Sequence, residues 1–346
     1  MGAGSIASGG GLGYTAHVTG IRPTKLLWMG AVTGYLLGRN LAFRHAPGLA
    51  NGLMRLGNVT GRGSDAEGEA ALDYFEGVVE DYERIAAHAG VCEGDGHEAA
   101  LFGGRRVLEL DHGNTRAVAM LARLRGAFSV DVYDSIDLQT RDPSRLRALY
   151  EDLLKRAGED PSRVDALLDG VRAHRDAAAL KASGRRFDLV VSRAVLEHVR
   201  DLKSLHRELR EVTTDDAVLI HKIDLRSHGF EWDHELDFLL FPERLYRSLT
   251  THIGEPNRVR AQGYLDVAQQ YGFTPVHVSA TRRISAERVA KLRDSLAEPY
   301  RSLSPEVLSV LGIWLVLVRE GHPLARSAKA IDLGSIPAAP SGMAPF

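Results

Sequence analysis

The chain has 346 residues and a formal net charge of −2, so it has no broad electrostatic attraction for nucleic acid or for an anionic membrane surface, and neither is an expected partner. Its single cysteine, Cys92, excludes an intrachain disulfide and a cysteine-based zinc cluster. Nothing in the composition indicates an oxidising compartment, and we expect a cytoplasmic location.

The first hundred residues are expected to form an extension of the main domain. Residues 1–20 are rich in Gly and Ser and lack the basic start and apolar core of a secretory signal, which predicts a flexible arm. The apolar run 26–37 is too short to span a bilayer, which takes roughly 20 apolar residues. We interpret 25–56 as helical and predict a helical N-terminal extension or lid over 21–100, whose apolar faces would contact the main domain or pair two chains as a homodimer.

From residue 70 onward, strand-like and helix-like patterns alternate, which favours a mostly parallel sheet with helices on both faces. An amphipathic helix is predicted at 70–88, followed by the glycine-rich link 90–104. A strand at 106–110, a helix at 116–124 and a second strand at 128–133 then form a βαβ unit of the kind with which nucleotide-binding α/β folds begin.

The second half of the chain continues this alternation. The charged segment 142–180 is predicted to be helical, and the apolar run 187–192 predicts a buried strand before a helix at 194–212. A turn and strand follow at 215–222. The remaining predicted elements are a helical region at 236–251, a helix at 261–271, a strand at 273–279, a helix at 286–298 and a strand at 313–319. The tail 326–346 is expected to be disordered.

Four segments together carry a family resemblance: VLELDHGNT at 107–115, VDVYD at 130–134, FDLVVSRAVLEHV at 187–199 and the YGF turn at 271–273. Over roughly residues 105–319 the chain resembles the class I S-adenosylmethionine (SAM)-dependent methyltransferases of the small-molecule type. The resemblance implies a Rossmann-like α/β fold with a doubly wound, seven-stranded, mostly parallel sheet in the order 3-2-1-4-5-7-6. It also implies a methyltransferase-like domain at 101–325 and SAM as the cofactor. A nicotinamide-dependent oxidoreductase shares the first βαβ unit but not the FDLVVSRAVLEHV element.

The resemblance assigns the first cofactor-binding residues to the ends of two strands. Glu109 would hold the loop or the cofactor's ammonium group, because a carboxylate suits a cation in a partly dry site. Gly113 would let the backbone lie against the cofactor. Asp134 would accept hydrogen bonds from both ribose hydroxyls, with Asp137 as the competing residue.

Asp111 departs from the family pattern, which has glycine at this position of the loop. It is included among the cofactor-binding residues, where its side chain would crowd the cofactor or place a second negative charge beside Glu109. Two functions therefore stay open. One is SAM-dependent methyl transfer to oxygen, nitrogen or carbon of a small-molecule acceptor, such as a secondary metabolite. The other is a methyltransferase-like protein without methyl transfer, either a repurposed enzyme such as a cyclase or a non-catalytic partner.

Further residues are assigned to the rim of the sheet by the same resemblance. Asp176 and Ala177 would bind the adenine amino group, the alternative being a solvated acid on a charged helix. Ser192 would contribute backbone to the cofactor site, since ligands of open α/β sheets bind at the carboxyl ends of the strands. Arg193 would face the substrate or form a surface ion pair.

The acceptor end is expected in the segment HKIDLRSHG, residues 221–229. Histidine is the natural base near neutral pH, and a carboxylate can fix and polarise an imidazole, so His228 with Asp224 is the predicted acid/base pair. Alternatively, these side chains and Arg226 organise a loop. Arg226 and His198 are assigned to the acceptor pocket, although packing would also explain His198. No metal site is expected. The spacing of the nearby polar residues forms no clear ligand motif; these residues are His228, His234, Glu235 and Asp237.

Overall fold

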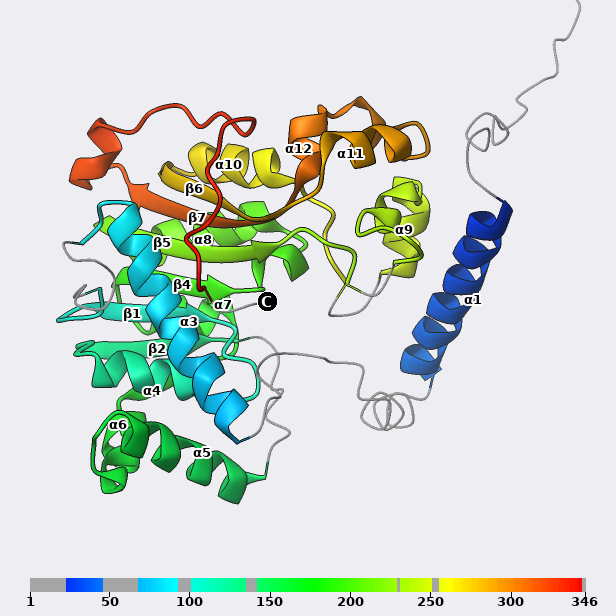
Figure 1. Ribbon diagram of the computed structural model, residues 1–346. Coiled ribbons are helices and arrows are strands. Elements are labelled where there is room, and N and C mark those ends of the chain that lie inside the picture. The colour runs from blue at the N-terminus through cyan, green and yellow to red at the C-terminus, as the bar shows by residue number, and fades with distance from the viewer. Residues whose placement is uncertain are drawn as a thin grey trace, which may run out of the picture.

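A seven-stranded sheet with helices on both faces organises the chain (Figure 1). The computed structural model describes residues 23–45, 68–92, 101–134, 142–228, 231–250 and 255–343. The strands are β1 (Arg106–Leu110), β2 (Ser129–Tyr133), β3 (Val171–His174), β4 (Phe187–Arg193), β5 (Thr213–Asp224), β6 (Phe273–Arg283) and β7 (Val310–Arg319). The α-helices are α1 (Pro23–His45), α3 (Glu69–His88), α4 (Ala117–Leu124), α5 (Pro143–Arg156), α6 (Val164–Asp169), α7 (Ala177–Ala182), α8 (Leu202–Val212), α9 (Glu243–Leu249), α10 (Ala261–Gln270), α11 (Ala286–Arg293) and α12 (Pro305–Ser309).

The strand order is β3-β2-β1-β4-β5-β7-β6, which confirms the predicted Rossmann-like fold class. The first five strands of this order pair in parallel, whereas β7 is antiparallel to both β5 and β6. Every residue of β7 is buried, as expected for an apolar strand with a neighbour on each side. The parallel strands all end at one edge of the sheet, where a ligand can reach several loops at once.

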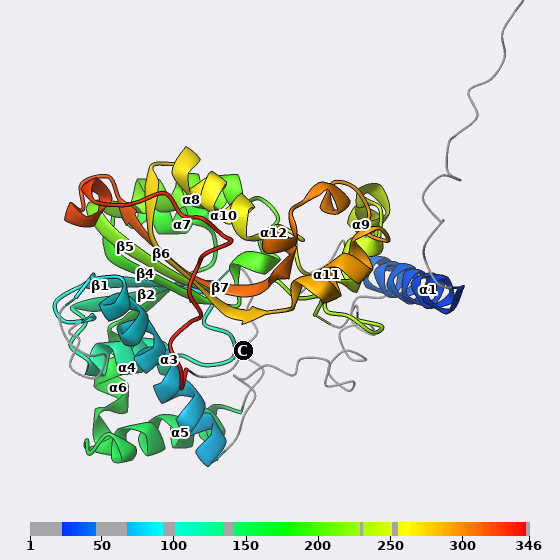
Figure 2. The ribbon, with the colours of Figure 1, turned by 45° about the horizontal axis from the view of Figure 1, so that its top comes forward.

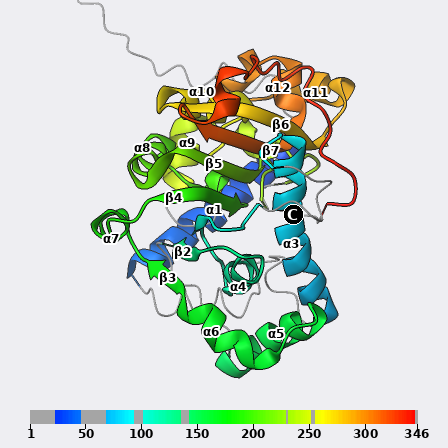
Figure 3. The same ribbon diagram turned by 90° about the vertical axis from the view of Figure 1, so that its left-hand side faces the viewer.

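Two helical layers cover the sheet (Figure 3). The helices α3, α4, α5 and α6 bury apolar side chains against one face, and α7, α8 and α10 bury theirs against the other. A third, smaller core joins α1, α9, α11 and α12 beyond the carboxyl edge. The sheet is therefore covered by one helical layer on each face, and α1, α9, α11 and α12 form a separate helical group beside the expected acceptor end.

The structure corrects two sequence-based predictions in the middle of the chain. The segment 142–180, expected to be helical, contains the edge strand β3, whose four residues are too few to show a strand pattern and whose central two are exposed. The helix expected at 194–212 begins only at Leu202, because the Asp201 side chain accepts a hydrogen bond from the Ser204 N–H and caps α8 there. A 3₁₀ turn at Leu196–His198 occupies the preceding segment.

The C-terminal tail is also different from the prediction. Residues up to 343 are placed, and Leu333 and Ile336 are buried in the core that α8 and α10 cover. The edge strand β6 binds this segment: the Ala280 N–H donates to the Pro337 carbonyl, and the Ala339 N–H donates to the Ala280 carbonyl. The expected disorder over 326–346 is therefore wrong for the described part, because two apolar side chains and a free strand edge hold it.

The N-terminal extension is helical, as predicted, in its described parts. Helix α1 lies beyond α9, at the opposite end of the molecule from α5 and α6 (Figure 2), and the Asn40 side chain donates to the Leu249 carbonyl at the end of α9. In the described residues, no helix has both the length and the apolar character needed to cross a membrane. The predicted flexible arm 1–20 and the continuation of the first helix to residue 56 lie outside the described residues.

Candidate functional site

The carboxyl edge of the sheet gathers most of the predicted site residues. Parallel pairing places the end of β1 between the ends of β2 and β4, and the end of β4 beside β5. Glu109, Asp134, Arg193 and Asp224 consequently approach this edge from four neighbouring strands. Tertiary structure thus assembles residues that are more than 100 positions apart in the chain.

Asp111 adopts the backbone conformation that usually requires glycine at this position of the loop. Its φ is +55°, in the left-handed region that Asp tolerates better than most residues, and Gly113 has φ +60°. The Asp111 side chain accepts a hydrogen bond of 3.0 Å from the Gly113 N–H, which stabilises the turn. The side chain of Thr115 accepts from the Ala117 N–H at the start of α4. The turn therefore accommodates the Asp111 side chain and is stabilised by it.

Glu109 is a buried carboxyl group whose environment favours a cation. Burial raises its pKa to about 8, and the nearby charges of Asp111 and Asp134 add to the effect. Its Oε2 has no hydrogen-bond partner among the described residues. A positively charged ligand would satisfy this oxygen and relieve the repulsion among the three carboxylates, and the ammonium group of SAM has the required chemistry. The residues present therefore fit the implied cofactor.

Asp134 directly follows β2, whose last residue accepts a hydrogen bond from the Asp111 N–H of the predicted cofactor loop, residues 111–115. It is buried, its N–H donates to the His174 carbonyl, and its carboxylate lies 3.7 Å from Nε2 of His112. His112 is a buried loop residue that the sequence analysis missed. It lies between Asp111 and Gly113, at a position for which the family motif specifies no residue type. The competing residue Asp137 lies outside the described residues, so the ribose contact of Asp134 stays a prediction.

Asp176 and Ala177 begin α7, and Asp176 is exposed. The Asp176 carboxylate accepts a hydrogen bond of 2.7 Å from the Ala179 N–H, so it caps the helix. This capping is a structural role at the carboxyl edge, after β3. The adenine contact of the two residues stays a prediction.

Ser192 and Arg193 both have protein partners. The Ser192 hydroxyl forms a 2.7 Å hydrogen bond with Nδ1 of His221 on β5, and burial lowers the pKa of His221 to about 3, which keeps that imidazole neutral. The Arg193 guanidinium binds the buried Asp81 carboxylate of α3 at 2.9 Å. This ion pair connects α3 to β4. It does not test whether Arg193 also faces the substrate, which stays a prediction.

Asp81 was missed by the sequence analysis, although the sequence holds a signal for it. Its neighbours along one face of α3, Val78, Tyr82 and Ile85, are all buried. An acidic residue within such an apolar stripe must meet a cation when the helix packs. The same region includes Lys222 of β5, whose pKa falls to about 7, chiefly because it is buried and further because Arg193 is close.

The predicted acid/base pair is assembled at the end of β5. Nε2 of His228 lies 3.1 Å from Oδ2 of the buried Asp224, and Arg226 donates to both Asp224 oxygens from its side chain. Burial opposes ionisation of Asp224, but His228 and Arg226 outweigh it and hold its pKa well below the usual range. His228 has a left-handed backbone, with φ +47°. The three residues thus form one cluster, which both the catalytic and the loop-organising interpretation require.

His198 lies beside this cluster, with its ring centroid 5.0 Å from that of His228. The preceding residue, Glu197, is 1% exposed, and its Oε1 accepts a 3.1 Å hydrogen bond from the Asp224 N–H. The 3₁₀ turn after β4 therefore lies directly against the end of β5. Glu197 was missed by the sequence analysis because the EHV element was interpreted through its histidine alone.

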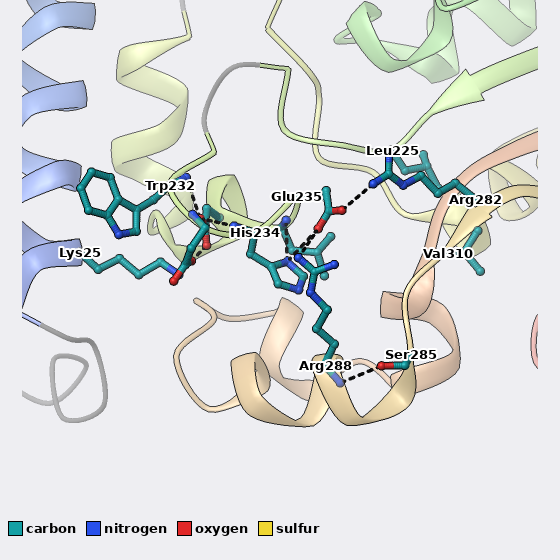
Figure 4. A network of polar contacts seen from close by, with 12 residues as sticks. Lys25, Leu225, Trp232, His234, Glu235, Arg282, Ser285, Arg288 and Val310 are labelled. Atoms are coloured by element: carbon teal, nitrogen blue, oxygen red, sulfur yellow. Dashed lines mark hydrogen bonds and ion pairs between the residues drawn. The ribbon is translucent and has the colours of Figure 1, made fainter. Parts of the chain in front are cut away.

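The loop after β5 is anchored by ion pairs to distant segments (Figure 4). Lys25 of α1 binds Asp233 at 2.7 Å and the buried Asp237 at 2.6 Å. Asp237 also accepts three backbone N–H bonds within the loop, from residues 232, 233 and 234. Glu235 pairs with Arg282 of β6 and Arg288 of α11. The acidic groups considered for a metal therefore have structural partners here.

Comparison with known proteins agrees with this architecture. A model of the methyltransferase domain family matches residues 96–278, just over half of the chain. No curated protein sequence matches the chain significantly.

Among solved structures, an S-adenosylmethionine-dependent methyltransferase from Mesorhizobium loti is similar at 18% identity, covering 63% of this chain and 92% of that one, with a TM-score of 0.38. A cyclopropane-fatty-acyl-phospholipid synthase-like protein from Lactobacillus casei is similar at 13% identity, covering 76% and 96%, with a TM-score of 0.43. TM-scores this low do not support a family assignment. The assignment depends on the family match together with the strand order. The chain belongs to the methyltransferase domain family and is a class I SAM-dependent methyltransferase, with SAM as its cofactor.

Proposed function

We propose that this methyltransferase transfers a methyl group directly to oxygen, nitrogen or carbon of a small-molecule acceptor, and that the Asp224–His228 pair receives the acceptor's proton. The observation that carries the proposal is the 3.1 Å contact between these side chains at the same sheet edge as Glu109. A net charge of −2 does not favour a polyanionic acceptor such as nucleic acid.

The residues of this chain have separate tasks in the proposed reaction. When bound, SAM supplies a methyl group that its sulfonium already activates. Glu109 would hold the ammonium group and so orient the cofactor, while the loop after β5 would hold the acceptor in line with the methyl group. Asp224 would fix the orientation of the imidazole through Nε2 of His228, which lies 3.1 Å from its Oδ2, and Nδ1 of His228 would take the proton of a hydroxyl or amine acceptor.

The alternative without methyl transfer rested on Asp111. Asp111 takes a left-handed backbone and its side chain bonds to the Gly113 N–H, so the shape of the loop gives the alternative no support. The charge of Asp111 does act on Glu109, which is why the test below includes SAM binding without turnover. We also keep as proposals the cytoplasmic location, which the single cysteine supports, and a homodimer through α1, whose Leu27, Tyr35 and Leu41 are exposed.

The test is a screen of small hydroxyl, amine and activated-carbon compounds with purified protein and SAM. We expect S-adenosylhomocysteine to form in proportion to a methylated product identified by mass spectrometry, with loss of turnover in His228→Asn. SAM binding measured by calorimetry without turnover on any compound would favour the alternative. Absence of SAM binding would contradict the cofactor assignment itself.

A further inference from the structure

The two histidines and the buried glutamate at the acceptor end lie close enough to bind one ion. Ligand atoms of Glu197, His198 and His228 all lie within 4.8 Å of one another. Two atoms bound to one zinc-sized ion are at most about 4.2 Å apart, since each metal–ligand distance is about 2.1 Å. Small side-chain rotations would therefore bring the three groups onto a common ion.

A second observation points to a ligand at this place. Glu197 is 1% exposed, and while its Oε1 is bonded to the Asp224 N–H, its Oε2 has no hydrogen-bond partner among the described residues. A buried carboxylate oxygen without a partner is costly. The Glu197 carboxylate belongs to a cluster that offers two imidazoles, and a cation bound by all three groups would satisfy its free oxygen.

The surroundings of the cluster suit metal binding as well. Asp224 lies 3.1 Å from Nε2 of His228, and a carboxylate beside a ligating imidazole orients the ring and strengthens its binding. The positive charge of Arg226 is largely offset at this site, because its guanidinium is bonded to both Asp224 oxygens. The acidic residues of the neighbouring loop have separate partners, which leaves the three-residue cluster as the place for an ion.

We propose that Glu197, His198 and His228 form a binding site for a divalent first-row transition ion, such as Zn²⁺ or Co²⁺, at the acceptor end of the sheet. Two imidazoles and one carboxylate match the ligand preference of these ions better than that of Mg²⁺ or Ca²⁺. Three protein ligands leave at least one coordination position open for water or for an acceptor oxygen. The site shares only His228 with the group of residues for which the sequence pattern predicts no metal site.

The inference goes beyond the proposed function, because ion binding needs neither SAM nor an acceptor. An ion would occupy His228, so the imidazole would act as a base only in the metal-free protein. In the metal-bound protein, an acceptor hydroxyl bound to the ion would have a lowered pKa and would lose its proton to solvent before methyl transfer. The metal content would then decide which acceptors are methylated.

The test uses the full-length protein freed of metal by a chelator and titrated with Co²⁺, whose visible absorption reports its ligands. We expect saturation at about one equivalent with a dissociation constant well below 1 mM, and competition by Zn²⁺. Glu197→Gln keeps the bond to the Asp224 N–H and should weaken Co²⁺ binding by about tenfold or more. The matched control, Glu235→Gln, removes a carboxylate that pairs with Arg282 and Arg288 and should bind Co²⁺ as the unaltered protein does.

Two results would overturn the site: no saturable Co²⁺ binding below about 1 mM, or the same affinity in Glu197→Gln as in the unaltered protein. Calorimetry with SAM on each variant shows whether it is folded. If Glu197→Gln does not fold, proton NMR of the unaltered Co²⁺ complex decides. Contact-shifted imidazole N–H signals support two histidine ligands, and their absence contradicts them. Failure of this test leaves SAM binding untouched, so it is distinguishable from failure of the proposed function.

Discussion

The predicted cofactor end of the sheet, at Glu109, Asp111 and Asp134, and the predicted acceptor end, at Asp224, Arg226 and His228, are built and charged differently. At the cofactor end, Glu109, Asp111 and Asp134 bring three carboxylates together, and the buried oxygen of Glu109 has no described partner. At the acceptor end, Asp224 is balanced by Arg226 and His228, and Lys25 balances the acidic loop after β5. The comparison teaches that the first region favours a positively charged ligand, whereas the second suits a neutral acceptor or a single bound ion.

The largest expected effect is a loss of turnover from a substitution at the predicted acceptor end that leaves SAM binding unchanged. His228→Asn removes the proposed base, so kcat for a hydroxyl or amine acceptor should fall by about 10²–10⁴-fold, while the dissociation constant of SAM should not change. Steady-state kinetics with the acceptor found by the screen, beside calorimetry with SAM, measures both quantities. An unchanged kcat would show that the cluster only organises the loop.

The next largest effect is weaker SAM binding from a substitution at the predicted cofactor end. Glu109→Gln keeps the shape of the side chain but removes the charge that would hold the ammonium group, which should weaken SAM binding by about 10–100-fold, or roughly 1.5–3 kcal/mol. The matched control is Glu83→Gln, a buried glutamate of α3 that pairs with Arg125. Equal SAM affinity in Glu109→Gln and the unaltered protein would remove Glu109 from the site.

A pH titration sharpens the same contrast in the absence of SAM. The folded protein holds a proton on Glu109 more tightly than the unfolded chain, because the pKa rises from 4.5 to about 8. This carboxyl group therefore makes the free energy of unfolding decrease as the pH rises from about 4.5 to about 8. Urea unfolding at several pH values should show a smaller decrease in Glu109→Gln, and SAM should restore stability most at the upper end of the range. An identical pH dependence in both proteins would contradict the raised pKa.

A smaller effect separates backbone from charge in the cofactor loop. Asp111→Ala should destabilise the protein by about 1 kcal/mol, because alanine tolerates φ +55° poorly and cannot accept the Gly113 hydrogen bond. Asp111→Gly and Asp111→Asn should unfold at urea concentrations close to that of the unaltered protein and bind SAM within a few-fold of it. SAM binding more than about tenfold tighter in Asp111→Gly would show that the aspartate crowds the cofactor.

The smallest effect concerns the anchoring of α1 to the acceptor loop. Lys25→Met removes the cation shared by Asp233 and Asp237 while keeping a long side chain. Amide hydrogen exchange of residues 23–45 should become about tenfold faster, and exchange in β1 and β4 should stay the same. Lys291→Met is the control, since its pair with Glu287 is exposed. Unchanged exchange in α1 would show that apolar packing alone holds the helix.

How much of each region could be predicted from sequence follows from how each is built. The cofactor loop is a local structure, so the strand, the turn and the helix after it were recognisable from consecutive residues, Glu109 among them. The pairing of His228 with Asp224 was also predictable, since four positions separate them on one loop. The partners of Glu197 and Asp81 could not be predicted, because they lie 27 and 112 residues away, although the apolar stripe around Asp81 indicates that this carboxylate must meet a cation.

The sequence by itself determined the alternation of strands and helices, the strand order implied by the family resemblance, and the acidic cofactor loop, because short-range patterns and motifs encode them. Only the tertiary structure decided that Asp111 takes a glycine-like backbone, that the C-terminal tail binds the edge strand, and that Glu197 lies among the acceptor-end histidines. These features depend on backbone angles and on contacts between distant segments, which burial and packing select and which no local pattern records.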